Sequence, residues 1–200
     1  SGVDANTFRA ENQLSEKPIV AILPGSRKQE ISKMLSVMLS VVKDFPDYQF
    51  VIAGAPSQEF SFYQQFISSD NIKFISNKTY ALLRNATAAL VTSGTATLET
   101  ALFKVPEVVC YKGSWASYQI AKRIITLKYI SLVNLIMDEE VVTELIQEEC
   151  TTKRISKEIK KILESNHRNT LLEKYALLED KLGGIGASEK TAKFIVSDLQ

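Results

Sequence analysis

Residues Val91–Glu99, which read VTSGTATLE, decide how the rest of the chain is interpreted. The stretch is typical of the end of a buried strand, a tight polar turn and the first turns of a helix. The first backbone N–H groups of a helix have no intrahelical partners, and the helix dipole adds a partial positive charge there. Gly94 lets a ligand approach the backbone, and hydroxyls nearby can donate further hydrogen bonds: those of Ser93, Thr95 and Thr97. The stretch therefore indicates either an anion-binding site or a simple helix cap made by Ser93.

A second stretch repeats this organisation near the start of the chain. The apolar run Pro18–Leu23 ends in the turn Pro24–Arg27 (PGSR), and an apolar stripe with helical spacing follows as far as Val42. Ser26 and Gln29 have the spacing of a capping box, which predicts that the helix begins there.

Strands and helices alternate along the chain, which predicts βαβ units and a parallel sheet. Five strands are expected, at residues 18–23, 48–53, 72–75, 88–91 and 108–111. We therefore expect an α/β fold with a Rossmann-like, doubly wound parallel sheet in the order 3-2-1-4-5. In that order Leu23 and Val91 end neighbouring strands, and ligands bind in the crevice at such carboxyl ends. Two helix starts and Arg27 should converge on that crevice.

Composition narrows the function classes. The chain has 200 residues, 45% of them hydrophobic, and a formal charge of +1, so its charge gives no support for a nucleic-acid partner. Cys110 and Cys150 match no metal spacing and suggest a reducing compartment. The single histidine, His167, is expected in a loop, which argues against a histidine triad or zinc site. Neither a P-loop nor a G-x-G-x-x-G fingerprint follows any strand, so no cofactor is expected. No Asp-x-Asp pair follows a strand to hold a divalent ion, so no metal is expected either.

The second half of the chain is less regular. The segment Trp115–Leu127 predicts an amphipathic helix that either packs on the surface or forms a basic interfacial contact with a membrane. No run reaches the ~18 apolar residues of a membrane-spanning helix. We expect an extended segment at Tyr129–Ile136, a helix beginning near Val141, and three helical stretches from Thr152 to the end.

The expected crevice suits a diphosphate. Arg27 and two helix starts would neutralise its charge without a metal ion, as a nucleotide diphosphate leaving group requires. Glu99 lies about one turn into its helix and could accept hydrogen bonds from a ribose diol. The alternative is that Glu99 simply faces solvent.

Three motifs, in order and at matching spacing, resemble those of the lipid-A-disaccharide synthases. They are LPGSR with Glu30-Ile31, SGTATLE at Ser93–Glu99, and Asn134-Leu135-Ile136 followed by ELIQ at Glu144–Gln147. The resemblance runs from Val3 to the C-terminus and covers the carboxyl-terminal half of that enzyme. Val133 stands where the family has a proline, which leaves the backbone around Asn134 less defined.

The resemblance implies the donor-binding domain of an inverting GT-B glycosyltransferase that transfers from UDP-diacylglucosamine to lipid X, releasing UDP. It implies that Arg27 and Asn134 are catalytic, and that the diphosphate meets Gly25, Ser26, Arg27 and the turn of Ser93, Gly94, Thr95, Ala96 and Thr97. It places Glu99 at the ribose, the backbone near Ile75 at the uracil, and Asn134 and Gln147 on the donor side. The general base is understood to lie on an N-terminal acceptor domain that this sequence does not include.

We accordingly divide the chain into three parts. Residues 1–16 are expected to be linker and a remnant of recombinant expression, 17–165 the donor-binding domain, and 166–200 helices that return to the N-terminal domain. Without that domain, the apolar face of Thr191–Leu199 invites helix exchange and a homodimer. The resemblance further implies a cytoplasmic enzyme peripheral to the inner membrane.

Two alternatives remain open. One is the donor domain of another UDP-GlcNAc-using GT-B enzyme, such as an epimerase or a peptidoglycan glycosyltransferase, which should carry its own histidine and acidic signatures. The other is a non-catalytic nucleotide-binding module.

Overall fold

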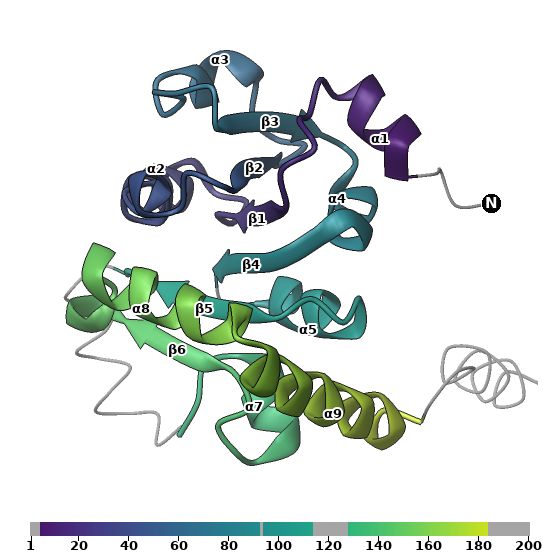
Figure 1. Cartoon of the computed structure of the whole chain (residues 1–200). Helices are drawn as coiled ribbons and strands as arrows, with labels where there is room; N and C mark the ends of the chain where they lie inside the picture. Colours follow the sequence, from purple (N-terminus) through teal and green to yellow (C-terminus); the bar gives the residue numbers. More distant parts are fainter. Residues whose placement is uncertain (1–4, 93, 114–127, 184–200) are drawn as a thin grey trace, which may run out of the picture.

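The chain forms a six-stranded parallel sheet with helices on both faces, as the computed structural model describes it for residues 5–92, 94–113 and 128–183 (Figure 1). The strands are β1 (Ile19–Leu23), β2 (Gln49–Gly54), β3 (Ile72–Ser76), β4 (Ala86–Thr92), β5 (Glu107–Tyr111) and β6 (Thr143–Ile146). The α-helices are α1 (Ala5–Glu11), α2 (Lys28–Leu39), α3 (Phe60–Gln64), α4 (Thr79–Asn85), α5 (Thr95–Leu102), α7 (Leu132–Met137), α8 (Thr152–Leu163) and α9 (Ser165–Lys181). Two short 3-10 helices are η1 (Val42–Asp44) and η2 (Gln147–Glu149).

The strand order is β3-β2-β1-β4-β5-β6. This confirms the predicted doubly wound order for the first five strands and adds β6 at the edge. Leu23 of β1 pairs in register with Val91 of β4, so the turns after these two strands leave the sheet side by side. The sheet therefore provides the crevice that the sequence predicted.

Alternate residues of β1 face opposite sides of the sheet, and both sides are buried. Val20 and Ile22 belong to a large apolar cluster that includes side chains of α2, α8 and α9. Ile19, Ala21 and Leu23 belong to a second cluster beneath α1 and α4. A parallel strand buried on both faces reads as a continuous apolar run, which is why Pro18–Leu23 was recognisable.

The structure differs from the sequence-based prediction where α7 (Leu132–Met137) and β6 (Thr143–Ile146) lie. Tyr129–Ile136, expected to be extended, contains the start of α7, whose N-cap Ser131 accepts a hydrogen bond from the Asn134 amide at 3.3 Å. The helix expected from Val141 is instead the short strand β6, which pairs with β5. Short apolar runs fit both helical and strand periods, so pattern alone did not separate them.

The chain termini also differ from expectation in part. Helix α1 forms within the stretch expected to be a linker, and its Phe8 is buried in the second apolar cluster. His167 lies in the first turn of α9 rather than in a loop. The expected helices at Trp115–Leu127 and Thr191–Leu199 lie outside the described residues. Within the described residues no helix is long and apolar enough to cross a membrane.

Candidate functional site

A cavity of about 310 Å³ lies at the carboxyl ends of β1, β2 and β4. Its walls are the turns after these strands and the starts of α2, α4 and α5. Six predicted site residues line it: Gly25, Ser26, Gly94, Thr95, Ala96 and Glu99. The two turns recognised in the sequence therefore meet at one site, at the crevice where doubly wound folds bind ligands.

Two glycines shape the walls. Gly25 has a φ of 101° and Gly94 a φ of 129°, a region that side-chain-bearing residues rarely adopt. A Cβ placed on Gly94 would meet no described atom within 4 Å, so the space beside it is open. Gly94 thus gives a ligand close access to the start of α5.

Helices α2 and α5, two of the three helices that begin at the cavity, lack side-chain caps. The N-cap of α2 is Arg27 and that of α5 is Gly94, and neither makes a side-chain cap hydrogen bond. This corrects the capping box expected at Ser26 and Gln29. Because the first N–H groups of a helix need partners, these two helix starts favour an anion in the cavity.

Arg27 and Thr97 occupy less direct positions than expected. Arg27 is exposed, one residue beyond Ser26, and is not part of the cavity lining. Thr97 is fully buried, and its hydroxyl donates to the Gly94 carbonyl at 2.8 Å. Ser93 lies outside the described residues.

Glu99 is half-buried and lines the cavity on the side of α4. The Tyr80 hydroxyl donates a long hydrogen bond of 3.5 Å to Glu99 Oε1. The Tyr80 ring stacks on Phe103, with ring centroids 5.3 Å apart. Tyr80 therefore contacts one oxygen of the carboxylate from the side of α4.

Glu30 and Thr92 are among the lining residues that the sequence did not single out as site residues. Glu30 lines the cavity from the first turn of α2, and its Oε2 accepts a hydrogen bond from the Ser26 amide at 3.3 Å. Thr92, the last residue of β4, is buried, and its Oγ1 has no hydrogen-bond partner in the described part of the chain. In the sequence Glu30 belongs only to the motif after LPGSR, and Thr92 only to the stretch Val91–Glu99.

Ile75 lies beside the cavity rather than in its lining. It is buried near the end of β3 and pairs with Ala53 of β2. A Cβ added to Gly54, which does line the cavity, would approach the Ile75 carbonyl oxygen to 3.3 Å. The Ile75 backbone is therefore one strand away from the cavity wall.

Asn134 lies apart from the cavity and is fully buried. Its Nδ2 donates to the Val142 carbonyl at 2.8 Å and to Glu144 Oε1 at 2.9 Å. Its Oδ1 accepts from the amides of Val141 and Val142 at 2.8 and 2.9 Å. Both polar atoms of this side chain are therefore already bonded within the protein.

Gln147 begins η2 directly after β6, at the same edge of the sheet as the cavity. Its φ is 51°, an unusual conformation for a residue with a side chain. Its Nε2 is buried without a hydrogen-bond partner among the described residues. The structure thus places an unsatisfied amide at the carboxyl end of the edge strand, outside the cavity lining.

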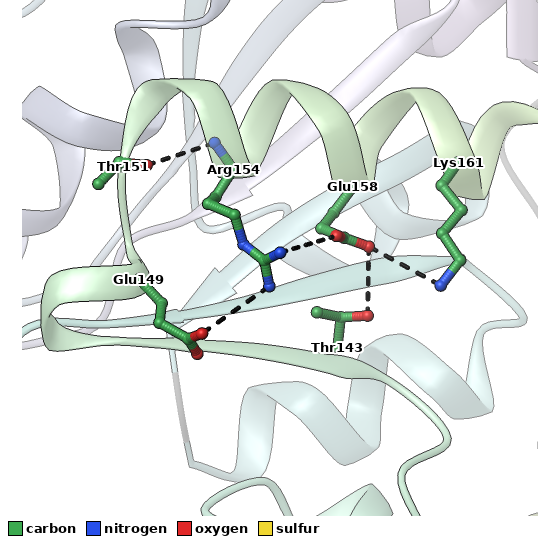
Figure 2. A network of polar contacts seen from close by, with 6 residues as sticks. All are labelled: Thr143, Glu149, Thr151, Arg154, Glu158 and Lys161. Atoms are coloured by element: carbon green, nitrogen blue, oxygen red, sulfur yellow. Dashed lines mark hydrogen bonds and ion pairs between the residues drawn. The ribbon is translucent and has the colours of Figure 1, made fainter.

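Side chains of α8 contact Thr143 at the start of β6 and Glu149 at the end of η2 (Figure 2). Thr143, the first residue of β6, donates a hydrogen bond of 3.5 Å to the buried carboxylate of Glu158. Arg154 lies 4.0 Å from Glu158 and also 4.0 Å from Glu149, at the end of η2. Helix α8 therefore contacts the segment formed by β6 and η2 at both of its ends, on either side of Gln147.

Within the described residues, no group of three or more His, Cys, Asp or Glu side chains could hold a metal ion. The cavity instead offers helix starts, backbone amides, hydroxyls and two carboxylates. The amides and hydroxyls can donate to an anionic group and the carboxylates can accept from hydroxyls, so the cavity suits a ligand that has both.

Known proteins give the arrangement its context. A family model described as lipid-A-disaccharide synthetase matches residues 3–193. A lipid-A-disaccharide synthase from Coxiella burnetii (strain CbuG_Q212) is 37% identical over 185 residues, which cover 90% of this chain and 49% of the relative. The enzyme of the same name from Syntrophus aciditrophicus is 38% identical over 194 residues, which cover 93% of this chain and 51% of the relative. The chain spans about half the length of the curated relatives it matches.

Solved structures match the fold. One titled S. aureus MnaA-UDP co-structure has a TM-score of 0.64 at 14% identity, covering 99% of this chain and 51% of that chain. The spinosyn rhamnosyltransferase SpnG has a TM-score of 0.59 at 14% identity, and the match covers 90% of this chain and 45% of that chain. These likenesses agree with the Rossmann-like α/β fold of GT-B glycosyltransferases.

Proposed function

The chain belongs to the lipid-A-disaccharide synthetase family, and from this premise we propose that its cavity binds the UDP-sugar donor of that family's glycosyl transfer. The observation that carries the proposal is the convergence of two helix starts without side-chain caps, those of α2 and α5, on one cavity. Such helix starts attract phosphate groups through free amides and the helix dipole. The diphosphate of the donor is the group expected there.

The proposed reaction joins UDP-diacylglucosamine to lipid X. The acceptor hydroxyl attacks the anomeric carbon, the bond to the diphosphate breaks with inversion, and UDP leaves. Negative charge grows on the diphosphate as that bond breaks, so the helix starts and Arg27 would stabilise the transition state more than the bound donor. The product is a β-linked disaccharide phosphate of the lipid A route.

Each predicted residue then has a proposed role. Gly25, Ser26, Arg27, Ser93, Gly94, Thr95 and Ala96 surround the diphosphate, Glu99 accepts from the ribose, the Ile75 backbone lies on the uracil side, and Gln147 faces the donor sugar. Asn134 acts as a positioning residue, because its own polar atoms already bond to Val141, Val142 and Glu144. Thr97 supports the turn through the Gly94 carbonyl.

Proton transfer needs a group beyond those in the cavity. An inverting transfer requires a general base at the acceptor hydroxyl, and we expect it in the half of the family enzyme that this chain does not match. The purified 200-residue chain should therefore bind UDP and transfer no sugar between UDP-diacylglucosamine and lipid X. Turnover by this chain alone would refute the division of labour.

The family's lipid substrates favour a cytoplasmic protein that contacts the inner membrane from one side. Contact through Trp115–Leu127, and a homodimer formed by exchange of Thr191–Leu199, belong to the same proposal. Sedimentation of the chain with and without vesicles would test both, since each predicts a different change in apparent mass.

Calorimetric titration tests the donor site directly. We expect the chain to bind UDP in preference to ATP and NAD. Replacing Arg27 with alanine should reduce UDP affinity by roughly 1.5 to 3 kcal/mol, the size of a hydrogen bond to a charged group. Equal affinity for all three nucleotides would contradict a UDP-specific site, and an unchanged affinity in Arg27→Ala would remove Arg27 from it.

A further inference from the structure

We propose that the hydroxyl of Thr92 is a ligand-binding group of the cavity and donates a hydrogen bond to an oxygen of the bound diphosphate. The inference rests on the proposed function and deepens it. It adds a donor from the end of β4 to a diphosphate site otherwise made of helix starts and Arg27.

The first observation is that Thr92 Oγ1 is unsatisfied. The residue is 2% exposed, and the hydroxyl has no hydrogen-bond partner in the described ranges. A buried hydroxyl without a partner costs free energy, so native proteins nearly always satisfy such groups with protein, water or ligand. A partner supplied from the cavity removes that cost.

The second observation is the contrast with neighbouring threonines. The Thr97 hydroxyl donates to the Gly94 carbonyl at 2.8 Å, and the Thr100 hydroxyl donates to the Ala96 carbonyl at 2.7 Å. Both are buried, and neither lines the cavity. Thr92 is buried, lines the cavity and makes no such bond within the described ranges, so its hydroxyl gives up no internal bond when it turns toward a ligand.

The third observation is the position of Thr92 in the sheet. It lies one residue beyond Val91, which pairs with Leu23 of β1. Thr92 therefore ends β4 next to the end of β1, where the turns after both strands begin. The start of α5 follows after Gly94, beside which the described structure leaves open space. The positive end of that helix selects an anion, and a hydroxyl can donate to one of its oxygens.

The experiment compares Thr92→Val, which removes the hydroxyl with little change in shape, with Thr92→Ser, which keeps it. Calorimetric titrations use UDP, inorganic pyrophosphate and uridine. We expect Thr92→Val to weaken UDP and pyrophosphate binding by about tenfold, as for loss of a hydrogen bond to a charged group. Uridine affinity should stay within about twofold, and Thr92→Ser should bind all three probes like the unmodified chain.

Stability provides the matched control. Without any probe, Thr92→Val should unfold at the same temperature as the unmodified chain or higher, because no intramolecular hydrogen bond is lost. Thr100→Val removes a bonded hydroxyl from a buried site outside the cavity, so it should unfold at a lower temperature while UDP affinity is unchanged. If Thr92→Val does not fold, Thr92→Ala takes its place with the same expected loss of affinity.

The outcomes separate this inference from the function on which it rests. Unchanged UDP and pyrophosphate affinity in Thr92→Val overturns the role of Thr92 and leaves the UDP site intact. An unmodified chain that binds pyrophosphate but not UDP overturns the proposed function, and the pyrophosphate series still decides the role of Thr92. A chain that binds neither probe overturns both.

Discussion

Glu30 places a carboxylate at the wall of a cavity that we expect to hold an anion. Its Oε2 accepts from the Ser26 amide at 3.3 Å, and a Cβ on Gly25 would come within 2.1 Å of the same atom. Gly25 is favoured by its φ of 101°, whereas the Glu30 side chain would have to shift to make room for a Cβ. The carboxylate occupies a backbone donor that a phosphate oxygen would also use.

Replacing Glu30 with glutamine should therefore raise UDP affinity, by roughly three- to tenfold, because a like charge and a competing acceptor are removed. Calorimetric titration at constant ionic strength measures the effect. Glu59→Gln, which removes the same charge from an exposed position outside the cavity lining, should bind UDP like the unmodified chain. Weaker binding by Glu30→Gln would instead assign Glu30 to holding the turn in shape.

Among the elements, α7 and β6 are joined by buried polar contacts in addition to the apolar burial of Val133 and Leu145. Glu144 of β6 accepts from the amides of Ile130 and Ser131, each at 2.9 Å, just before α7 begins. Asn134 of α7 bonds in turn to Glu144 and to the backbone before β6. The apolar periodicity around these residues carried no sign of such contacts, which is why the sequence predicted neither element correctly.

Replacing Asn134 with alanine should destabilise the chain by about 2 to 4 kcal/mol, because the Val142 amide would lose its buried acceptor and the Val141 amide would keep only the Glu139 carbonyl. Urea unfolding gives the free energy, and hydrogen exchange should show faster exchange at those two amides. Asn166→Ala, at an exposed position of α9, provides the control and should change stability little. Normal stability of Asn134→Ala combined with loss of UDP binding would contradict a positioning role.

At the scale of the whole molecule, the sheet order and the meeting of two turns followed from the sequence. Strands that are buried on both faces appear in a sequence as continuous apolar runs, and the glycines after Leu23 and Val91 mark the turns that follow them. The places of Glu30 and Thr92 in the cavity wall did not follow from the sequence. Glu30 depends on its contact with the Ser26 amide, and Thr92 on the lack of a partner for its hydroxyl within the described residues, and both appear only in three dimensions. The family resemblance places Asn134 on the donor side, and no sequence pattern showed that its polar atoms bond to Val142 and Glu144.

The opposite end of the sheet holds a buried carboxyl that should make stability depend on pH. Glu107, the first residue of β5, is fully buried, and neither oxygen has a partner among the described residues. Burial raises the pKa of this carboxyl well above its ordinary value of 4.5. The buried hydroxyl of Tyr175 on α9, whose pKa burial also raises, lies near enough to feel its charge.

The sign of the pH effect follows from proton linkage. Below the ordinary pKa, Glu107 binds a proton in both the folded and unfolded chain; above it, the unfolded chain loses the proton first. Stability should therefore fall relative to Glu107→Gln by about 1.4 kcal/mol per pH unit, until the folded-state pKa is reached. Urea unfolding of both chains from about pH 4 to pH 8 measures this difference, with Glu59→Gln as the exposed control. A difference that stays constant over that range would mean that Glu107 has an ordinary pKa in the folded chain and that its surroundings are effectively solvated.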